Sequence, residues 1–102
     1  MRLDHYPEGK LKRQILKIVG KYLDLKTYHV FIFGSRAGSS GPERSDIDIG
    51  ILGPQEIPGN IRIEILEELE NLPVLYRFDL VDFHNVTPEF KKEALKTIEY
   101  VN

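Results

Sequence analysis

The hydrophobic residues near the start of the chain recur at the spacing of an α-helix. Lysines lie between them, so one face of such a helix is apolar and the other is charged. The apolar positions are Leu11, Ile15, Ile18, Val19, Tyr22 and Leu23. This pattern predicts a first helix from Glu8 to about Leu25.

Two β-strands are expected next. Residues 28–33 (YHVFIF) are rich in β-branched and aromatic side chains and end at a glycine, which is typical of a buried strand followed by a sharp turn. After the Gly- and Ser-rich stretch 37–44, residues 45–52 (SDIDIGIL) alternate strictly. Because strand side chains alternate between the two faces, the isoleucines should face the core, while Asp46 and Asp48 share the open face.

The second half of the chain predicts a helix, a strand and a closing helix. A helical stripe follows Asn60, which can serve as its N-cap, and ends before Pro73, although an IRIEI alternation leaves the helix start open. Residues 74–83 (VLYRFDLVDF) have strand composition, and Thr87 with Pro88 begins a last helix to about Val101. The order α-β-β-α-β-α predicts an α/β (α+β) fold with a small mixed sheet and helices packed on one face.

Composition narrows the possible chemistry. The 102 residues, 41% of them hydrophobic, predict one domain over residues 1–102. With no cysteine, a metal would need oxygen or imidazole ligands, which favours hard cations such as Mg²⁺. The charged first residues lack a secretory signal and no apolar run is long enough to span a bilayer, so we expect a cytoplasmic protein without a membrane partner. The net charge of -2 argues against nucleic acid as a partner.

The most specific pattern is Gly34-Ser35-Arg36 followed by Asp46-x-Asp48. Gly34 lets a ligand approach the backbone closely, Ser35 offers an N–H group and a hydroxyl, and Arg36 can add a charge-assisted contact to a phosphate. Alone, a Gly-Ser pair after a strand is usually only a turn. Two carboxylates about 7 Å apart on one strand face repel each other unless a cation lies between them. Together the two motifs predict a site for a metal-bound nucleoside triphosphate.

The segment FGSRAGSSGPERSDIDIGIL resembles the signature of the DNA polymerase beta superfamily of nucleotidyltransferases, Gly-Ser followed after a spacer by Asp-x-Asp. With RFDLVDF and TPEFKKEAL included, most of the chain resembles the minimal nucleotidyltransferases (MNT proteins), which are encoded beside HEPT-domain partners. The resemblance implies that Asp46, Asp48 and a third carboxylate bind two Mg²⁺ ions. It also implies that Gly34 and Ser35 hold the terminal phosphates of ATP.

Asp79 and Asp82 are the candidates for the third carboxylate. They are three positions apart in the predicted third strand, so they should point to opposite faces of the sheet. Asp79 lies in the FDLV segment, where the family places its acid. We therefore assign the third metal ligand to Asp79 and expect Asp82 to be solvated or to cap a loop.

The resemblance further implies an enzyme that transfers AMP from ATP to a hydroxyl, by analogy a tyrosine of a HEPT-type toxin, so that the chain acts as the antitoxin. Two alternatives stay open. The first is a non-catalytic antitoxin that inhibits its partner by forming a complex. The second is a nucleic-acid-binding domain or a subunit that adds nucleotides to RNA ends, against both of which the negative net charge argues.

Overall fold

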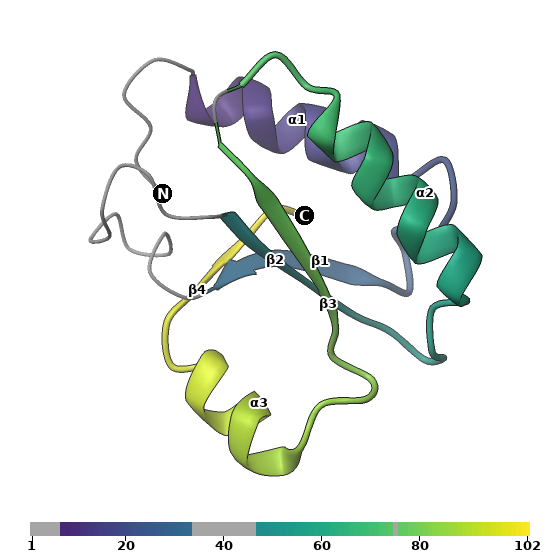
Figure 1. Ribbon diagram of the computed structural model, residues 1–102. Helices are drawn as coiled ribbons and strands as arrows, with labels where there is room; N and C mark the ends of the chain where they lie inside the picture. The colour runs from purple at the N-terminus through teal and green to yellow at the C-terminus, as the bar shows by residue number, and fades with distance from the viewer. Residues whose placement is uncertain (1–6, 34–46, 75) are drawn as a thin grey trace.

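The computed structural model of the chain describes residues 7–33, 47–74 and 76–102, in which three helices accompany a four-stranded sheet (Figure 1). In chain order the elements are α1 (Glu8–Val19), β1 (His29–Phe33), β2 (Ile47–Leu52), α2 (Gly59–Glu70), β3 (Phe78–Asp82), α3 (Pro88–Ala94) and β4 (Ile98–Tyr100). The mixed α/β class predicted from the sequence is confirmed.

The sheet has the strand order β3-β2-β1-β4 and mixes both pairing directions. Strand β1 pairs antiparallel with β2 and with β4, whereas β2 and β3 are parallel. Parallel neighbours require a crossover connection, and α2 supplies it between β2 and β3. The order brings β3 next to β2, the strand that carries Asp48.

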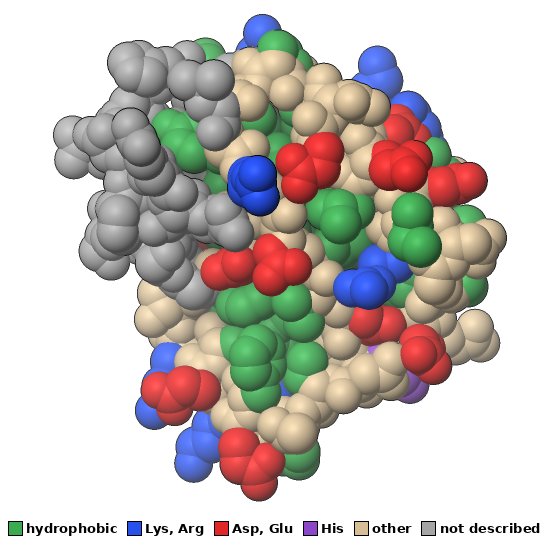
Figure 2. Space-filling model, in the orientation of Figure 1, with side chains coloured by type: hydrophobic (Ala, Val, Ile, Leu, Met, Phe, Trp, Pro, Cys, Tyr) green, Lys and Arg blue, Asp and Glu red, His purple; other side chains and the backbone are tan. Residues whose placement is uncertain are grey.

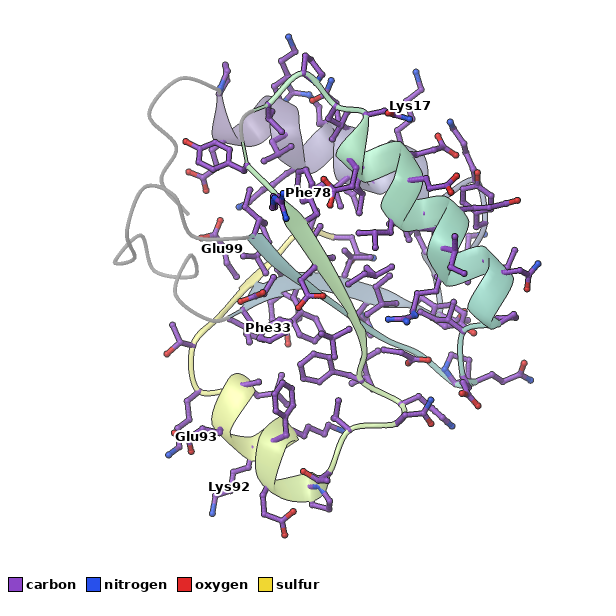
Figure 3. The ribbon with its side chains drawn as sticks, viewed as in Figure 1. Lys17, Phe33, Phe78, Lys92, Glu93 and Glu99 are labelled. Atoms are coloured by element: carbon purple, nitrogen blue, oxygen red, sulfur yellow. The ribbon has the colours of Figure 1, made fainter. Side chains whose placement is uncertain are left out.

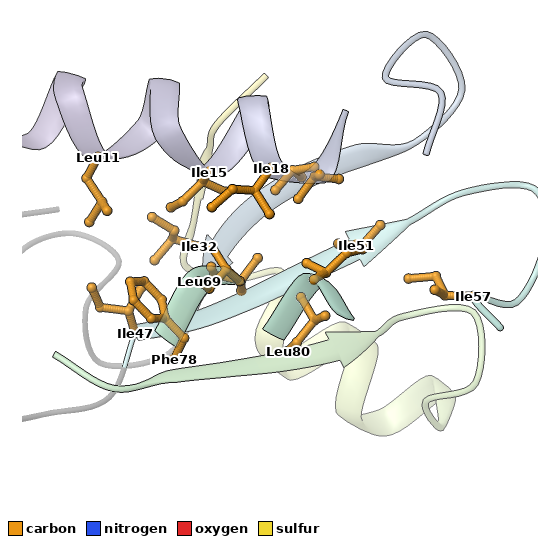
Figure 4. Packing of buried hydrophobic residues seen from close by; sticks show 14 residues of the cluster. Leu11, Ile15, Ile18, Ile32, Ile47, Ile51, Ile57, Leu69, Phe78 and Leu80 are labelled. Carbon is orange, nitrogen blue, oxygen red and sulfur yellow. The ribbon is translucent and has the colours of Figure 1, made fainter. Parts of the chain in front are cut away.

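The main hydrophobic core lies between one face of the sheet and helices α1 and α2 (Figure 4). Alternate residues of each strand point into it, as the period-two pattern of residues 45–52 predicts. Its members include Leu11 and Ile15 of α1, Ile32 of β1, Ile47, Ile49 and Ile51 of β2, Ile65 and Leu69 of α2, and Phe78 and Leu80 of β3. The isoleucine face of β2 is therefore buried, and Asp48 lies on the opposite face.

The opposite face of the sheet carries a second, smaller cluster of buried aromatic residues. Phe31, Phe33 and Phe83 form it, and Ala94 and Leu95 from the end of α3 pack against them. Figure 1 accordingly shows α1 and α2 on one side of the sheet and α3 on the other. The expectation that the helices pack on one face is wrong for α3, because the alternate residues of β1 are also apolar and require cover.

The C-terminal segment differs from its prediction. Helix α3 ends at Ala94 instead of continuing to about Val101, and Ile98–Tyr100 form β4. The backbone N–H of Val101 donates to the carbonyl of Val30 at 2.8 Å, and Lys12 of α1 forms an ion pair with Glu99 at 2.6 Å. The added strand gives β1 a partner along an edge that would otherwise be unpaired.

Two helix boundaries also differ from the sequence prediction. Helix α1 ends at Val19, with Gly20 as its C-cap, and turns occupy most of the remaining residues to Leu25. Helix α2 already includes Gly59, so Asn60 lies within its first turn and is not its N-cap. Within the described parts of the chain, no helix is long and apolar enough to cross a membrane.

Candidate active site

Two of the predicted carboxylates lie directly beside each other. Asp48 of β2 and Asp79 of β3 are register partners in the parallel pair, on the sheet face opposite α1 and α2. Neighbouring strands are about 4.8 Å apart, so the two side chains start within reach of one cation. Asp48 is half-buried and Asp79 is exposed. The antiparallel neighbour of Asp48 on its other side is Phe33 of β1.

The apolar neighbours of each aspartate determine where its side chain points. In β3, Phe78 and Leu80 are buried in the main core, which directs Asp79 to the other face. In β2, Ile47 and Ile49 do the same for Asp48. A slip of one residue in either strand would bury a carboxylate in the core and expose isoleucine or leucine, so the hydrophobic pattern strongly specifies the register.

Asp82 has a structural role. Its Oδ2 atom accepts a hydrogen bond from the backbone N–H of Ile57 at 2.8 Å, and its Oδ1 atom accepts one from that of His84 at 2.9 Å. These bonds tie the end of β3 to the loop before α2 and to the turn after β3. The expectation that Asp82 caps a loop is confirmed. Of the two candidates for the third carboxylate, Asp79 is the one that shares a face with Asp48.

Gly34, Ser35, Arg36 and Asp46 lie outside the described residues. The described residues that flank them are the end of β1 at Phe33 and the start of β2 at Ile47, so this segment joins two strand ends beside the carboxylate pair. Among the residues that are described, no group of three or more potential metal ligands forms a site. The oxygen donors of Asp48 and Asp79 nevertheless suit Mg²⁺, which prefers one or two protein carboxylates.

Aromatic rings cover the sheet face next to the carboxylates. A side-chain carbon placed on Gly50, two residues beyond Asp48, would lie 2.4 Å from Phe31 Cε2 and 2.6 Å from Phe83 Cε1. Phe33 meets Phe83 edge-on, with their ring centroids 5.1 Å apart, and Figure 3 shows Phe33 between the sheet and α3. The open face therefore has a charged part and an aromatic part that adjoin each other along the strands.

The sequence prediction did not assign these aromatic residues to the site. It gave no role to Phe33 or Phe90, and the structure shows that Phe83 is buried with Phe31 and Phe33. One signal was available, because Phe31 and Phe33 alternate with core residues and so had to occupy the other face. The antiparallel register that sets Phe33 opposite Asp48 follows only from the paired strands.

Paired carboxylates on the open face of a small mixed sheet, beside the end of β1 and the start of β2, define a candidate site for metal-assisted transfer of a phosphate-containing group. The chain belongs to the polymerase beta nucleotidyltransferase family, whose model matches residues 10–101. The family predicted from the sequence is thus confirmed.

Solved structures share this fold. A chain of the complex between a tri-AMPylated Shewanella oneidensis HEPN toxin and an MNT antitoxin has a TM-score of 0.70 and 20% identity, over 91% of this chain and 70% of that chain. A toxin–antitoxin structure with AMP-PNP has a TM-score of 0.74 and 21% identity, over 89% of this chain and 72% of that chain. The toxin–antitoxin MntA-HepT has a TM-score of 0.70 and 19% identity, over 93% of this chain and 72% of that chain. The comparison with curated proteins found no significant match.

Proposed function

We propose that this chain is a Mg²⁺-dependent nucleotidyltransferase that transfers AMP from ATP to a tyrosine hydroxyl of a HEPN-type (HepT) toxin, and that it thereby acts as the antitoxin of the pair. The observation that carries the proposal is the register pairing of Asp48 with Asp79 on the open face of the sheet. Membership of the nucleotidyltransferase family supports the reaction type. The similar structures, one with an AMPylated toxin and one with AMP-PNP, support the partner and the donor.

The residues divide into metal-binding and phosphate-binding groups. Asp48 and Asp79, with Asp46, would hold the Mg²⁺ ions. Gly34, Ser35 and Arg36 would bind the terminal phosphates, as predicted from the sequence. We further propose that residues 1–102 form one minimal catalytic domain, since α1 packs on the sheet and β4 is one of its strands. Use of ATP as the donor suits a cytoplasmic protein.

The proposed reaction exchanges one P–O bond for another. The phenolic oxygen of the acceptor bonds to the α-phosphorus of ATP, the bond from that phosphorus to the bridging oxygen breaks, and pyrophosphate leaves while the phenolic proton is released. Bound Mg²⁺ would neutralise charge on the phosphate oxygens and align the reacting groups. The protein contributes the geometry, because Asp48 and Asp79 extend from two rigid, paired strands.

The test measures transfer of labelled AMP from ATP to the purified HEPN-type partner in the presence of Mg²⁺. Mutation of a residue that only hydrogen-bonds to a metal ligand commonly lowers metal affinity or activity by about 10- to 100-fold. Asp48 and Asp79 would bind the metal directly, so we expect Asp48→Asn and Asp79→Asn to lower the transfer rate by more than roughly 100-fold. Asp82→Asn is the matched control, because Asp82 lies on the same strand but caps loops, and it should retain transfer.

An unchanged transfer rate in Asp48→Asn would contradict the proposed function. A second readout separates catalysis from binding. If Asp48→Asn loses transfer but still neutralises the partner completely, complex formation alone is sufficient, which favours the non-catalytic antitoxin. If neutralisation is lost together with transfer, the covalent modification is responsible.

A further inference from the structure

We propose that Phe90, supported by Phe33 and Phe83, forms an acceptor-docking platform that contacts an apolar, tyrosine-bearing segment of the partner protein. This inference rests on the proposed function. It adds the surface that receives the acceptor, whereas the carboxylates account for the metals and the nucleotide.

Phe90 is a large apolar side chain in an otherwise polar setting. It is 44% exposed, although α3 around it carries charged residues such as Glu89 and Lys92. Its ring lies 6.1 Å from that of Phe33 and 5.8 Å from that of Phe83, measured between centroids. Because Phe33 and Phe83 are buried, Phe90 is the one of these three rings that faces solvent. A partner that covers Phe90 would remove apolar surface from water, and the Phe90 side chain would lose little conformational entropy on binding.

The platform adjoins the candidate active site. Phe33 is the register partner of Asp48, which pairs with Asp79 on the next strand, so a continuous row leads from the platform to the carboxylates. In Figure 2 an apolar patch lies directly beside acidic side chains on this face, with further charged groups below it. An apolar centre with a charged surround is the usual composition of a protein-binding surface.

The direction of the reaction assigns the platform to the acceptor instead of the leaving group. In phosphoryl-type transfer the attacking and leaving oxygens lie roughly in line on opposite sides of the phosphorus. The segment predicted to hold the terminal phosphates leaves the sheet at Phe33 and returns at Ile47, at the Asp48 end of the strands. Gly50 and Phe83 lie toward the other end of the same face. Pyrophosphate would thus depart at the Phe33 end of this face, and the acceptor hydroxyl would approach from the side of Phe83, the other ring that Phe90 contacts.

The start of α3 holds Phe90 in place. The Thr87 hydroxyl caps the helix by accepting a hydrogen bond from the backbone N–H of Phe90 itself, at 3.1 Å, and Pro88 stiffens the first turn. A fixed aromatic residue loses little conformational freedom when a partner binds, which favours affinity. The capping bond thus fixes the backbone from which the Phe90 ring extends before any partner arrives.

The experiment compares partner binding with nucleotide binding in the full chain. Affinity for the purified HEPN-type protein is measured without nucleotide by calorimetry, and affinity for Mg²⁺·AMP-PNP is measured separately. We expect Phe90→Ala to weaken partner binding by about 10- to 100-fold and to raise KM for the partner, with nucleotide affinity unchanged. Ile63→Ala is the control, because Ile63 is 57% exposed on α2 and should affect neither measurement.

A second variant keeps the proposal testable if Phe90→Ala does not fold. Phe90→Leu retains apolar cover over the cluster and should give a smaller loss of partner affinity in the same direction. Unchanged partner affinity in both variants would overturn the platform, and so would a loss confined to AMP-PNP, which would assign the ring to the nucleotide base. The Asp48→Asn protein separates the two proposals: if it still transfers AMP, the proposed function fails regardless of how Phe90 variants bind.

Discussion

Replacement of Gly50 by alanine tests the packing of the sheet face that carries Asp48 and Asp79 directly. Gly50 lies in the interior of β2, two residues from Asp48, and its backbone is covered by aromatic rings. An added Cβ would approach Phe31 Cε2 to 2.4 Å and Phe83 Cε1 to 2.6 Å, both well inside van der Waals contact. Since Phe31 and Phe83 are each 2% exposed and pack edge-on at 4.8 Å, neither ring can swing into solvent to make room.

The expected cost follows from this overlap. Inserting one methyl group into a well-packed core typically costs about 1–3 kcal/mol, and the two contacts at Gly50 place this site toward the upper part of that range. For a domain of this size, each kcal/mol lowers Tm by about 4–8 °C. Gly50→Ala should therefore lower Tm by roughly 10–20 °C.

The assay is urea and thermal unfolding followed by circular dichroism, with Gly59→Ala as the matched control. Gly59 begins α2 and a Cβ placed there meets nothing within 4 Å, so alanine should leave the free energy of unfolding unchanged or raise it by less than about 1 kcal/mol. Because Phe83 also supports Phe33, Gly50→Ala should weaken partner binding along with stability. If Gly50→Ala is as stable as Gly59→Ala, the aromatic cluster does not pack against β2 as described.

Two further predictions concern individual carboxylates. Asp82→Ala should lower the free energy of unfolding by about 1–3 kcal/mol, because it leaves two backbone N–H groups without acceptors. Asp79→Ala should abolish AMP transfer and leave the free energy of unfolding nearly unchanged. Equal losses of stability in the two variants would contradict the structural role of Asp82 and the metal-binding role of Asp79. Hydrogen bonds from Lys21 and Tyr22 lower the pKa of Glu68 below its ordinary 4.5, so its contribution to stability is present above pH 4.5 and is lost as the pH falls through the lowered pKa. Urea unfolding at a series of acidic pH values should show that the free energy of unfolding falls less steeply with pH in Glu68→Gln than in the unmodified protein. The Glu68 carboxylate also raises the pKa of Tyr22 to about 12, so that pKa should fall toward 10 in the same variant.

The faces of the strands could be predicted because side-chain alternation is a local property. The sequence SDIDIGIL places its isoleucines on one face whatever the rest of the chain does, and the buried Ile47, Ile49 and Ile51 confirm this. The same argument separated Asp79 from Asp82, and the hydrogen bonds of Asp82 confirm its capping role. The family could also be predicted, since its signature is a short motif with fixed spacing.

The predictions that failed are the length of the last helix and the face on which it packs. In both cases contacts with distant parts of the chain outweigh the local conformational preference of the sequence. Thr87 and Pro88 do begin a helix, but residues 98–100 pair with β1 because that strand would otherwise have an open edge. A helical continuation was locally reasonable, and no local pattern reveals that β1 lacks a second neighbour. The placement of α3 on the aromatic face has a similar cause, since it depends on which face α1 and α2 leave uncovered.

By itself, the sequence determined which face of each strand is apolar, and so directed Asp48 and Asp79 away from the core, because residue type and period-two alternation are local. It also predicted a phosphate-binding turn at Gly34-Ser35-Arg36 and a metal-binding carboxylate at Asp46. Only the tertiary structure decided that Asp79 is the register partner of Asp48, that Phe33 lies on the other side of Asp48, and that the half-exposed ring of Phe90 lies against Phe33. These are relations between segments far apart in the chain. They depend on strand order and register, which the packing of the whole sheet determines.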